Sequence, residues 1–340
     1  MAREDQIRGY LLEEMLAWLL RNNGYELLTK VIPGDPALAM AGAGLTVRGR
    51  GAAHQADVLG EFPFTPPFSL PIRMFVEAKS LRAKVDLPVV RNAWATIEDV
   101  NQFDVGLNPN RYRYVYALFS TSGFTREAVD FALTHQISLV DLTLPMYDAL
   151  RAALDAAASA VVRDAVGPGS DMRLRQVARS VLGTAEVRLP NVPGLQRITT
   201  AIEQLRSALQ ASFGGEILLA FPPAPFFLAL TGDVSRFLSF VAEHADHQVN
   251  IYRADEDATA PEWVIQADGG SYPGDKPGYQ LRFSLPPHVE EWLLSDRRHA
   301  RHLKKTSLAT IMIYQERDGV PHAYQLRYLP RPRTTQERQA

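Results

Sequence analysis

Two residues of opposite charge share one face of a short predicted strand. The segment Phe75-Val76-Glu77-Ala78-Lys79-Ser80 has the composition of a strand, in which side chains alternate between two faces. Glu77 and Lys79 therefore point the same way, and the opposite face is apolar. A carboxylate can bind a divalent metal, and an ammonium group beside it can reach a water or a phosphate oxygen. Solvated charges give the same pattern, so this segment alone leaves both interpretations open.

A second acid stands twenty residues upstream, in another segment that predicts a strand. This segment runs from His54 to Gly60 and carries Asp57 as its acid. An Asp and a Glu that lie together offer the hard oxygen ligands that Mg²⁺ prefers. We therefore expect Asp57 and Glu77 to form one site.

A third acid, Glu13, lies in a predicted N-terminal helix. Residues 5–23 carry leucines at helical spacing and end in Asn-Asn-Gly. Glu13 is one turn from Gly9 and one turn from Ala17, and these small residues would let another backbone come close. Glu13 is a candidate for a crevice, with a solvated flank of the helix as the alternative.

Three basic residues precede Asp57 and are candidates for contacts with phosphate. Arg48 and Arg50 belong to an Arg-Gly-Arg-Gly sequence of loop composition, and His54 opens the Asp57 segment. A solvated turn for the arginines and an ordinary structural role for His54 are the alternatives.

The C-terminal part of the chain is basic, although the whole chain has a formal net charge of −2. The last 44 residues hold ten Lys or Arg against three acids. Arg297–Lys305 predicts the end of a helix that begins near Pro287. Arg297, Arg298 and Arg301 are therefore candidates for DNA contacts. Cations are also favourable at the C-terminus of any helix, which is the alternative explanation.

The order of predicted elements favours two domains. From Tyr112 onward the chain alternates strand, helix and strand, which is typical of a mixed or parallel sheet flanked by helices. Helices follow, and then several short strands. We expect four regions: an α/β domain at 1–145, a helical linker region at 146–214, an α+β domain of unassigned role at 215–330, and a basic tail at 331–340.

Composition restricts the chemistry and the location. The chain contains no cysteine, which excludes disulfides, thiolate metal sites and a Cys nucleophile. No apolar run is long enough for a membrane helix, and the N-terminus lacks a signal-peptide pattern, so we expect a cytoplasmic protein without a membrane partner. No Gly-x-Ser-x-Gly sequence occurs, which argues against a Ser/His hydrolase.

Together these segments resemble the Mrr-like restriction endonucleases of the PD-(D/E)xK nuclease superfamily. The resemblance covers about residues 5–145 and rests on five motifs in order: Gly9–Tyr25, similar to the first helix with its acid at Glu13; His54–Val58, similar to the metal-binding Asp strand; Val76–Lys79, similar to the Glu-x-Lys strand; Tyr116–Ala128, similar to the strand–turn–helix that follows; and Ile137–Asp141, similar to the final core strand. This chain differs in having Ala56 in place of proline before Asp57, and in a proline-rich insertion at 61–71.

The resemblance implies a restriction-endonuclease-like core and a metal-dependent endonuclease that hydrolyses phosphodiester bonds. Asp57 and Glu77 would bind Mg²⁺, or Mn²⁺ in its place, with the carbonyl of Ala78 as a further ligand. Lys79 would orient the attacking water or stabilise charge in the transition state, and Glu13 would support a ligand or a water, or help to hold a second metal. The resemblance also implies DNA rather than RNA as the nucleic-acid partner and a role in restriction or defence. It leaves a homodimer open.

Two other functions stay open. One is a catalytically inactive, nuclease-like module that binds nucleic acid, although the presence of Asp57, Glu77 and Lys79 together argues against it. The other is a nuclease effector gated by a ligand that the domain at 215–330 senses.

Overall fold

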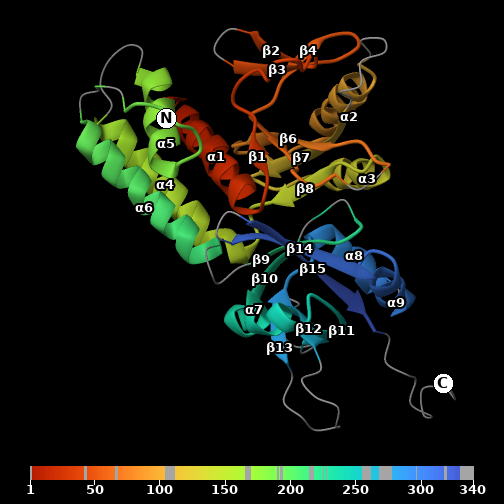
Figure 1. Cartoon of the computed structure of the whole chain (residues 1–340). Coiled ribbons are helices and arrows are strands. Elements are labelled where there is room, and N and C mark those ends of the chain that lie inside the picture. The colour runs from red at the N-terminus through yellow and green to blue at the C-terminus, as the bar shows by residue number, and fades with distance from the viewer. Residues whose placement is uncertain are drawn as a thin grey trace, which may run out of the picture. The chain divides into compact units, whose positions relative to one another are not determined.

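The chain forms two compact units, Met1–Ser212 and Phe213–Ala340, in a computed structural model (Figure 1). The structure describes residues 2–41, 44–65, 68–103, 112–164, 170–189, 191, 194–213, 218–224, 226, 228–254, 262–267, 278–295, 297–317 and 320–329. The predicted basic tail at 331–340 lies outside these residues. None of the helices within them has the length and apolar character that a membrane span requires.

The first unit is built on a mixed five-stranded sheet in the order β1-β5-β6-β7-β8. Its strands are β1 (Glu26–Leu27), β5 (Val58–Glu61), β6 (Ile72–Lys79), β7 (Arg113–Ser120) and β8 (Ser138–Asp141). β1, β5 and β6 pair antiparallel, whereas β6, β7 and β8 pair parallel. The parallel half agrees with the alternation of strand and helix predicted from Tyr112 onward.

Helices cover both faces of this sheet, as Figure 1 shows. They are α1 (Ala2–Asn22), α2 (Leu87–Asn101) and α3 (Arg126–Thr134). α1 contacts β5 and β6, and Gly60 permits the close approach because a Cβ there would lie 3.0 Å from the Leu20 side chain. Phe75 and Tyr116 point to the other face, where they share an apolar core with α2 and α3. The expected mixed sheet flanked by helices is confirmed.

A separate three-stranded sheet consists of β2 (Leu38–Ala41), β3 (Gly44–Arg48) and β4 (Ala53–Gln55). The prediction of one continuous strand over 54–60 is therefore wrong, because β4 and β5 belong to different sheets. The chain changes sheets at Ala56 and Asp57. There the N–H of Asp57 donates to the carbonyl of Val76 at 3.1 Å, which starts the pairing of β5 with β6. Asp57 therefore lies immediately before the first residue of β5.

The described part of the region between residues 146 and 214 is mostly helical. It contains a short 3₁₀ turn, η1 (Pro145–Tyr147), followed by α4 (Asp148–Asp164), α5 (Ser170–Leu182) and α6 (Leu195–Phe213). α4 and α5 contact α1, and almost all of the region lies within the first unit. α5 is thereby placed next to the helix that carries Glu13.

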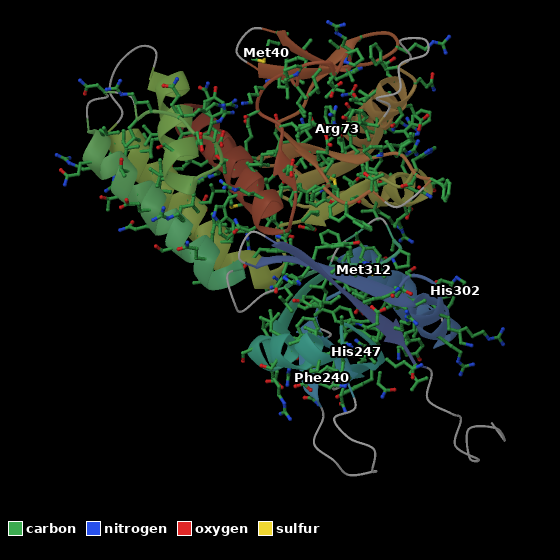
Figure 2. The ribbon with its side chains drawn as sticks, viewed as in Figure 1. Met40, Arg73, Phe240, His247, His302 and Met312 are labelled. Atoms are coloured by element: carbon green, nitrogen blue, oxygen red, sulfur yellow. The ribbon has the colours of Figure 1, made fainter. Side chains whose placement is uncertain are left out.

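One buried cation stabilises the first unit from within the sheet. The side chain of Arg73 on β6 is fully buried, and Figure 2 labels it. Its guanidinium forms ion pairs with Asp35 and, at 2.9 Å, with Glu61. It also donates to the Tyr114 hydroxyl at 3.0 Å and lies 3.3 Å from the centre of the Tyr112 ring. Two carboxylates and two aromatic rings thus compensate this charge.

The second unit is a closed barrel with strand order β10-β13-β12-β11-β15-β14-β9. Its strands are β9 (Leu218–Phe221), β10 (Leu228–Gly232), β11 (Asp246–Ala254), β12 (Glu262–Ala267), β13 (Tyr279–Phe283), β14 (Thr310–Arg317) and β15 (Val320–Tyr328). Its helices are α7 (Val234–Glu243), α8 (Pro287–Ser295) and α9 (Arg297–Lys305). Closure pairs every strand on both sides. The expected second domain of helices and strands is present, and the barrel is its specific architecture.

The barrel has one apolar core, to which all seven strands contribute buried side chains. Phe237 of α7 is fully buried in this core and lies edge-on to Tyr279 and Tyr324. Figure 2 labels Phe240 and His247, which belong to an aromatic group beside this core. The two units therefore bury separate cores.

Candidate functional site

Asp57 lies where β5 begins, beside the C-terminal part of β6, and a hydrogen bond orients its carboxylate. The register pairs Val58 of β5 with Val76 of β6, so the residue before Val58 lies beside the residue after Val76, which is Glu77. The Asp57 carboxylate accepts a hydrogen bond of 2.8 Å from the N–H of Ala78. The pKa of Asp57 is raised overall, mainly by burial. The hydrogen bond from Ala78 lowers it, and the negative charge of Glu77 raises it further. The two carboxylates thus influence each other electrostatically.

Glu77 and Lys79 share a face of β6, as the alternation predicted. The Lys79 ammonium forms an ion pair with one carboxylate oxygen of Glu77, and the Tyr116 hydroxyl donates to the other. The side chains of Glu77 and Lys79 are 22% and 28% exposed, so solvent reaches both. Burial and the negative charge of Glu77 raise the pKa of Tyr116, which keeps its hydroxyl protonated as a donor.

Glu13 on α1 lies near Asp57. Burial, and then the charge of Asp57, raise the pKa of Glu13 from 4.5 to about 7. Its carboxylate forms an ion pair with Arg175 of α5. The Glu13 side chain is 14% exposed, so of the two alternatives left by the sequence it occupies a crevice and not a solvated flank.

A pocket in the first unit connects Glu13 with Asp57. It is lined by Glu13, Glu14, Ala17, Leu27, Leu28, Thr29, Gly44, Leu45, Gln55, Ala56, Asp57, Val58, Leu59, Arg175, Arg179 and Thr184. Glu77 and Lys79 do not line this pocket. Their charges nevertheless act on the pKa of Asp57, which does line it. Asp57 is therefore common to the pocket and to the Glu77–Lys79 end of β6.

The donor atoms at this end of β6 fit a hard divalent cation. Within the residues that the structure describes, no group of three or more His, Cys, Asp or Glu side chains is arranged to hold a metal ion. Mg²⁺ is commonly bound through one or two carboxylates, with water and substrate phosphates completing its shell. Asp57 and Glu77 supply two carboxylates, so the pair fits Mg²⁺ or Mn²⁺. The carbonyl of Ala78 as a further ligand stays a prediction.

The three basic residues before Asp57 differ in their surroundings. Arg48 and Arg50 are exposed. His54 is part of a local network, since its Nε2 lies 2.7 Å from a carboxylate oxygen of Asp99 on α2. Asp99 also accepts hydrogen bonds from the backbone N–H groups of Gly51 and Ala52, and the hydrogen bond with His54 lowers the pKa of Asp99. This network gives His54 a structural role, and its contact with substrate stays a prediction.

The basic stretch near the C-terminus forms α9 of the second unit, separate from α8. Leu303 is buried and Ala300 packs against the barrel core, so the apolar face of α9 is covered. Arg298 and Arg301 are exposed on the other face, and the side chain of Arg297 lies outside the described atoms. DNA contact through this face stays a prediction.

Two residues of this site were not predicted from the sequence. Tyr116 orients Glu77, and the alternation along β7 places it on the face that packs beside Glu77. Arg175 contacts Glu13 from 162 residues away, and no local pattern connects α5 with α1. Alternation could have suggested the tyrosine, whereas the arginine required the tertiary structure.

Comparisons with known proteins leave the family undetermined. No family model and no curated protein matches the chain. One solved structure that matches is the crystal structure of AF1548, a protein of unknown function, with 17% sequence identity. The match covers 60% of this chain and 98% of that chain, with a TM-score of 0.33. At this level of similarity the match carries no argument about function.

Proposed function

We propose that the chain is a divalent-metal-dependent endonuclease that hydrolyses phosphodiester bonds of DNA. The observation that carries this proposal is the meeting of Asp57, Glu77 and Lys79 at the adjoining ends of β5 and β6. Two carboxylates and one ammonium group at a solvent-accessible strand end are the groups that a metal-dependent phosphodiesterase needs. The resemblance to Mrr-like nucleases, noted from the sequence, names the same residues.

Each residue has a separate role in this proposal. Asp57 and Glu77 hold Mg²⁺ or Mn²⁺, and Tyr116 and the Ala78 N–H keep the two carboxylates in place. When bound, the ion would polarise the scissile phosphate and lower the pKa of a water. Lys79 stabilises negative charge on the phosphate oxygens. A carboxyl with a pKa of about 7, as in Glu13, can accept a proton from a water near neutral pH.

The proposed substrate is DNA, and the proposed setting is restriction or defence. The exposed guanidinium groups of Arg48, Arg50 and Arg301 are available to neutralise phosphates. Phosphate neutralisation supplies affinity without sequence information, so the recognised sequence or modification depends on other contacts.

A cleavage assay tests the proposal. The wild type is incubated with plasmid DNA, modified plasmid DNA and RNA, each with Mg²⁺, with Mn²⁺ or with chelator. We expect cleavage of DNA only with metal. Asp57→Asn should abolish cleavage and keep DNA binding, because affinity comes mainly from cations. Asp130→Asn, an exposed acid of α3, is the matched control and should cleave like the wild type.

The second candidate is an inactive module that binds nucleic acid. It is favoured by the lack, among the described residues, of a group of three side chains that could hold a metal. This candidate predicts binding that chelator does not change and no cleavage of any of these substrates. The same assay therefore separates the two functions.

A further inference from the structure

Arg175 lies beside two acids of the proposed site. Its guanidinium forms an ion pair with Glu13 and lies 4.2 Å from the centre of the Tyr10 ring. Arg175 also lines the pocket that contains Asp57. A positive charge from α5 thus stands beside carboxylates from α1 and from the end of β5.

A neighbouring ion pair shows what a purely structural arrangement looks like here. Arg179, one turn further along α5, donates to Glu14 at 2.8 Å. The second carboxylate oxygen of Glu14 accepts from the Thr184 hydroxyl at 2.9 Å, and the Glu14 side chain is only 5% exposed. Both oxygens of Glu14 are therefore satisfied inside the protein.

The carboxylate of Glu13 has different neighbours from that of Glu14. It faces another carboxylate, Asp57, and the described cation paired with it is Arg175, whose side chain is 28% exposed. Arg175 lines the pocket, so water there can solvate its guanidinium when the ion pair with Glu13 opens. The charge that stabilises this pair of acids is therefore exchangeable.

We propose that Arg175 is an internal counter-ion that competes with the divalent metal for the Glu13–Asp57 side of the site. This inference rests on the proposed function. In the metal-free protein the guanidinium reduces the repulsion between the two carboxylates. A divalent ion at Asp57 supplies that charge instead and repels the guanidinium at short range. Arg175 then turns out of the pocket, where a guanidinium can bind a phosphate oxygen of the substrate.

Metal affinity tests this proposal directly. Calorimetric titration with Mn²⁺ compares the wild type with Arg175→Met and with the matched control Arg163→Met, an exposed arginine of α4 that does not line the pocket. We expect the Kd for Mn²⁺ to fall about three- to tenfold in Arg175→Met, since one competing cation is lost. We expect no change in Arg163→Met. Arg175→Lys keeps the charge and should bind Mn²⁺ as the wild type does.

The thermal midpoint in chelator gives a second readout. Arg175→Met should unfold at lower temperature than the wild type, and saturating Mn²⁺ should raise its midpoint by more than it raises that of the wild type. If Arg175→Met does not fold, Arg175→Gln takes its place, because the amide keeps a polar contact with Glu13.

Two different failures can be told apart. Unchanged or weaker Mn²⁺ binding in Arg175→Met, with a wild type that binds Mn²⁺ and cleaves DNA, would overturn the inference about Arg175 alone. A wild type that neither binds Mn²⁺ nor cleaves would overturn the proposed nuclease, and the counter-ion role would fall with it.

Discussion

Both ends of strand β6 carry charged side chains on the same face, but these side chains differ in their exposure to solvent. At one end, Arg73 is fully buried and compensated by Asp35, Glu61 and the Tyr114 hydroxyl. At the other end, Glu77 and Lys79 remain about one quarter exposed. At the first end the charge on the strand itself is closed to solvent, whereas at the second end both strand charges are open to it.

The proton affinities of the neighbouring acids differ in the same way. Next to Glu77, burial raises the pKa of Asp57, and it raises that of Glu13 to about 7. These carboxylates therefore hold a proton more tightly than exposed acids do. Perturbed acids in a pocket are typical of functional sites, whereas a fully compensated ion cluster is typical of structural ones. We infer that the Arg73 end stabilises the fold and the Glu77 end performs the chemistry.

The largest effect on stability should come from the closed end. Arg73→Met leaves the buried carboxylate of Asp35 without its cation and removes the partner of Glu61, which should lower the free energy of unfolding by about 3–5 kcal/mol. Urea unfolding followed by circular dichroism measures the loss. Arg113→Met, an exposed arginine of β7, should change stability little. A loss below about 1 kcal/mol for Arg73→Met would show that the buried cluster does not have this role.

The next effect depends on pH and belongs to the open end. The pKa of Glu13 is raised from 4.5 to about 7, so between these values the folded chain holds a proton that the unfolded chain releases. The contribution of protonated Glu13 to stability is therefore fully present below pH 4.5 and is lost as pH rises through 7. The loss is up to about 3 kcal/mol, since each pKa unit corresponds to ~1.4 kcal/mol.

Glu13→Gln should flatten this dependence. Urea unfolding at pH 5 and pH 8 should give a smaller difference in the variant than in the wild type. Glu203→Gln, an exposed acid of α6, should keep the wild-type difference. An equal pH dependence in the wild type and Glu13→Gln would contradict the assigned pKa.

A smaller effect should follow from loss of the Tyr116 hydroxyl. Tyr116→Phe keeps the ring that stacks on Phe75 and removes one donor to Glu77. We expect a loss of stability of about 0.5–1.5 kcal/mol, which is typical of one hydrogen bond. The rate of metal-dependent cleavage should fall by about tenfold. A less well oriented Glu77 raises the activation barrier, and a rise of about 1.4 kcal/mol lowers a rate by a factor of ten. An unchanged rate would show that Lys79 alone orients Glu77.

The smallest effect should lie in the second unit. Arg301→Glu should weaken DNA binding a few-fold and reduce the salt dependence of binding by about one to two ions. Fluorescence anisotropy at several salt concentrations measures both quantities. Arg236→Glu, an exposed residue of α7, provides the same charge change elsewhere on the barrel. Equal losses in the two variants would exclude a specific role for α9.

Local patterns predicted the parts of the site that lie on single elements. The alternation along β6 put Glu77 and Lys79 on one face, which the ion pair confirms. The helical spacing around Glu13 left a crevice and a solvated flank both open. The sheet change at Asp57 was not predicted, because it depends on hydrogen bonds to β6, which no pattern in residues 54–60 contains.

Long-range pairing limited the remaining predictions. Arg175 is adjacent to Glu13 only because α5 packs on α1. The barrel closes through a parallel pairing of β11 with β15 and through β9 and β10, which lie in a proline-interrupted apolar stretch. Such contacts join segments that are distant in sequence, so hydrophobic periodicity does not reveal them.

The central claim is that a divalent metal binds where Asp57 meets Glu77. Fe²⁺ can replace Mg²⁺ at hard-oxygen sites, and with ascorbate and peroxide it generates radicals that cut the nearby backbone. Mass spectrometry of the fragments then locates the metal. The account predicts cuts next to Asp57 and between Val76 and Lys79, which excess Mg²⁺ suppresses and Asp57→Asn abolishes. Cuts that avoid both segments, or that persist unchanged in Asp57→Asn, would contradict it.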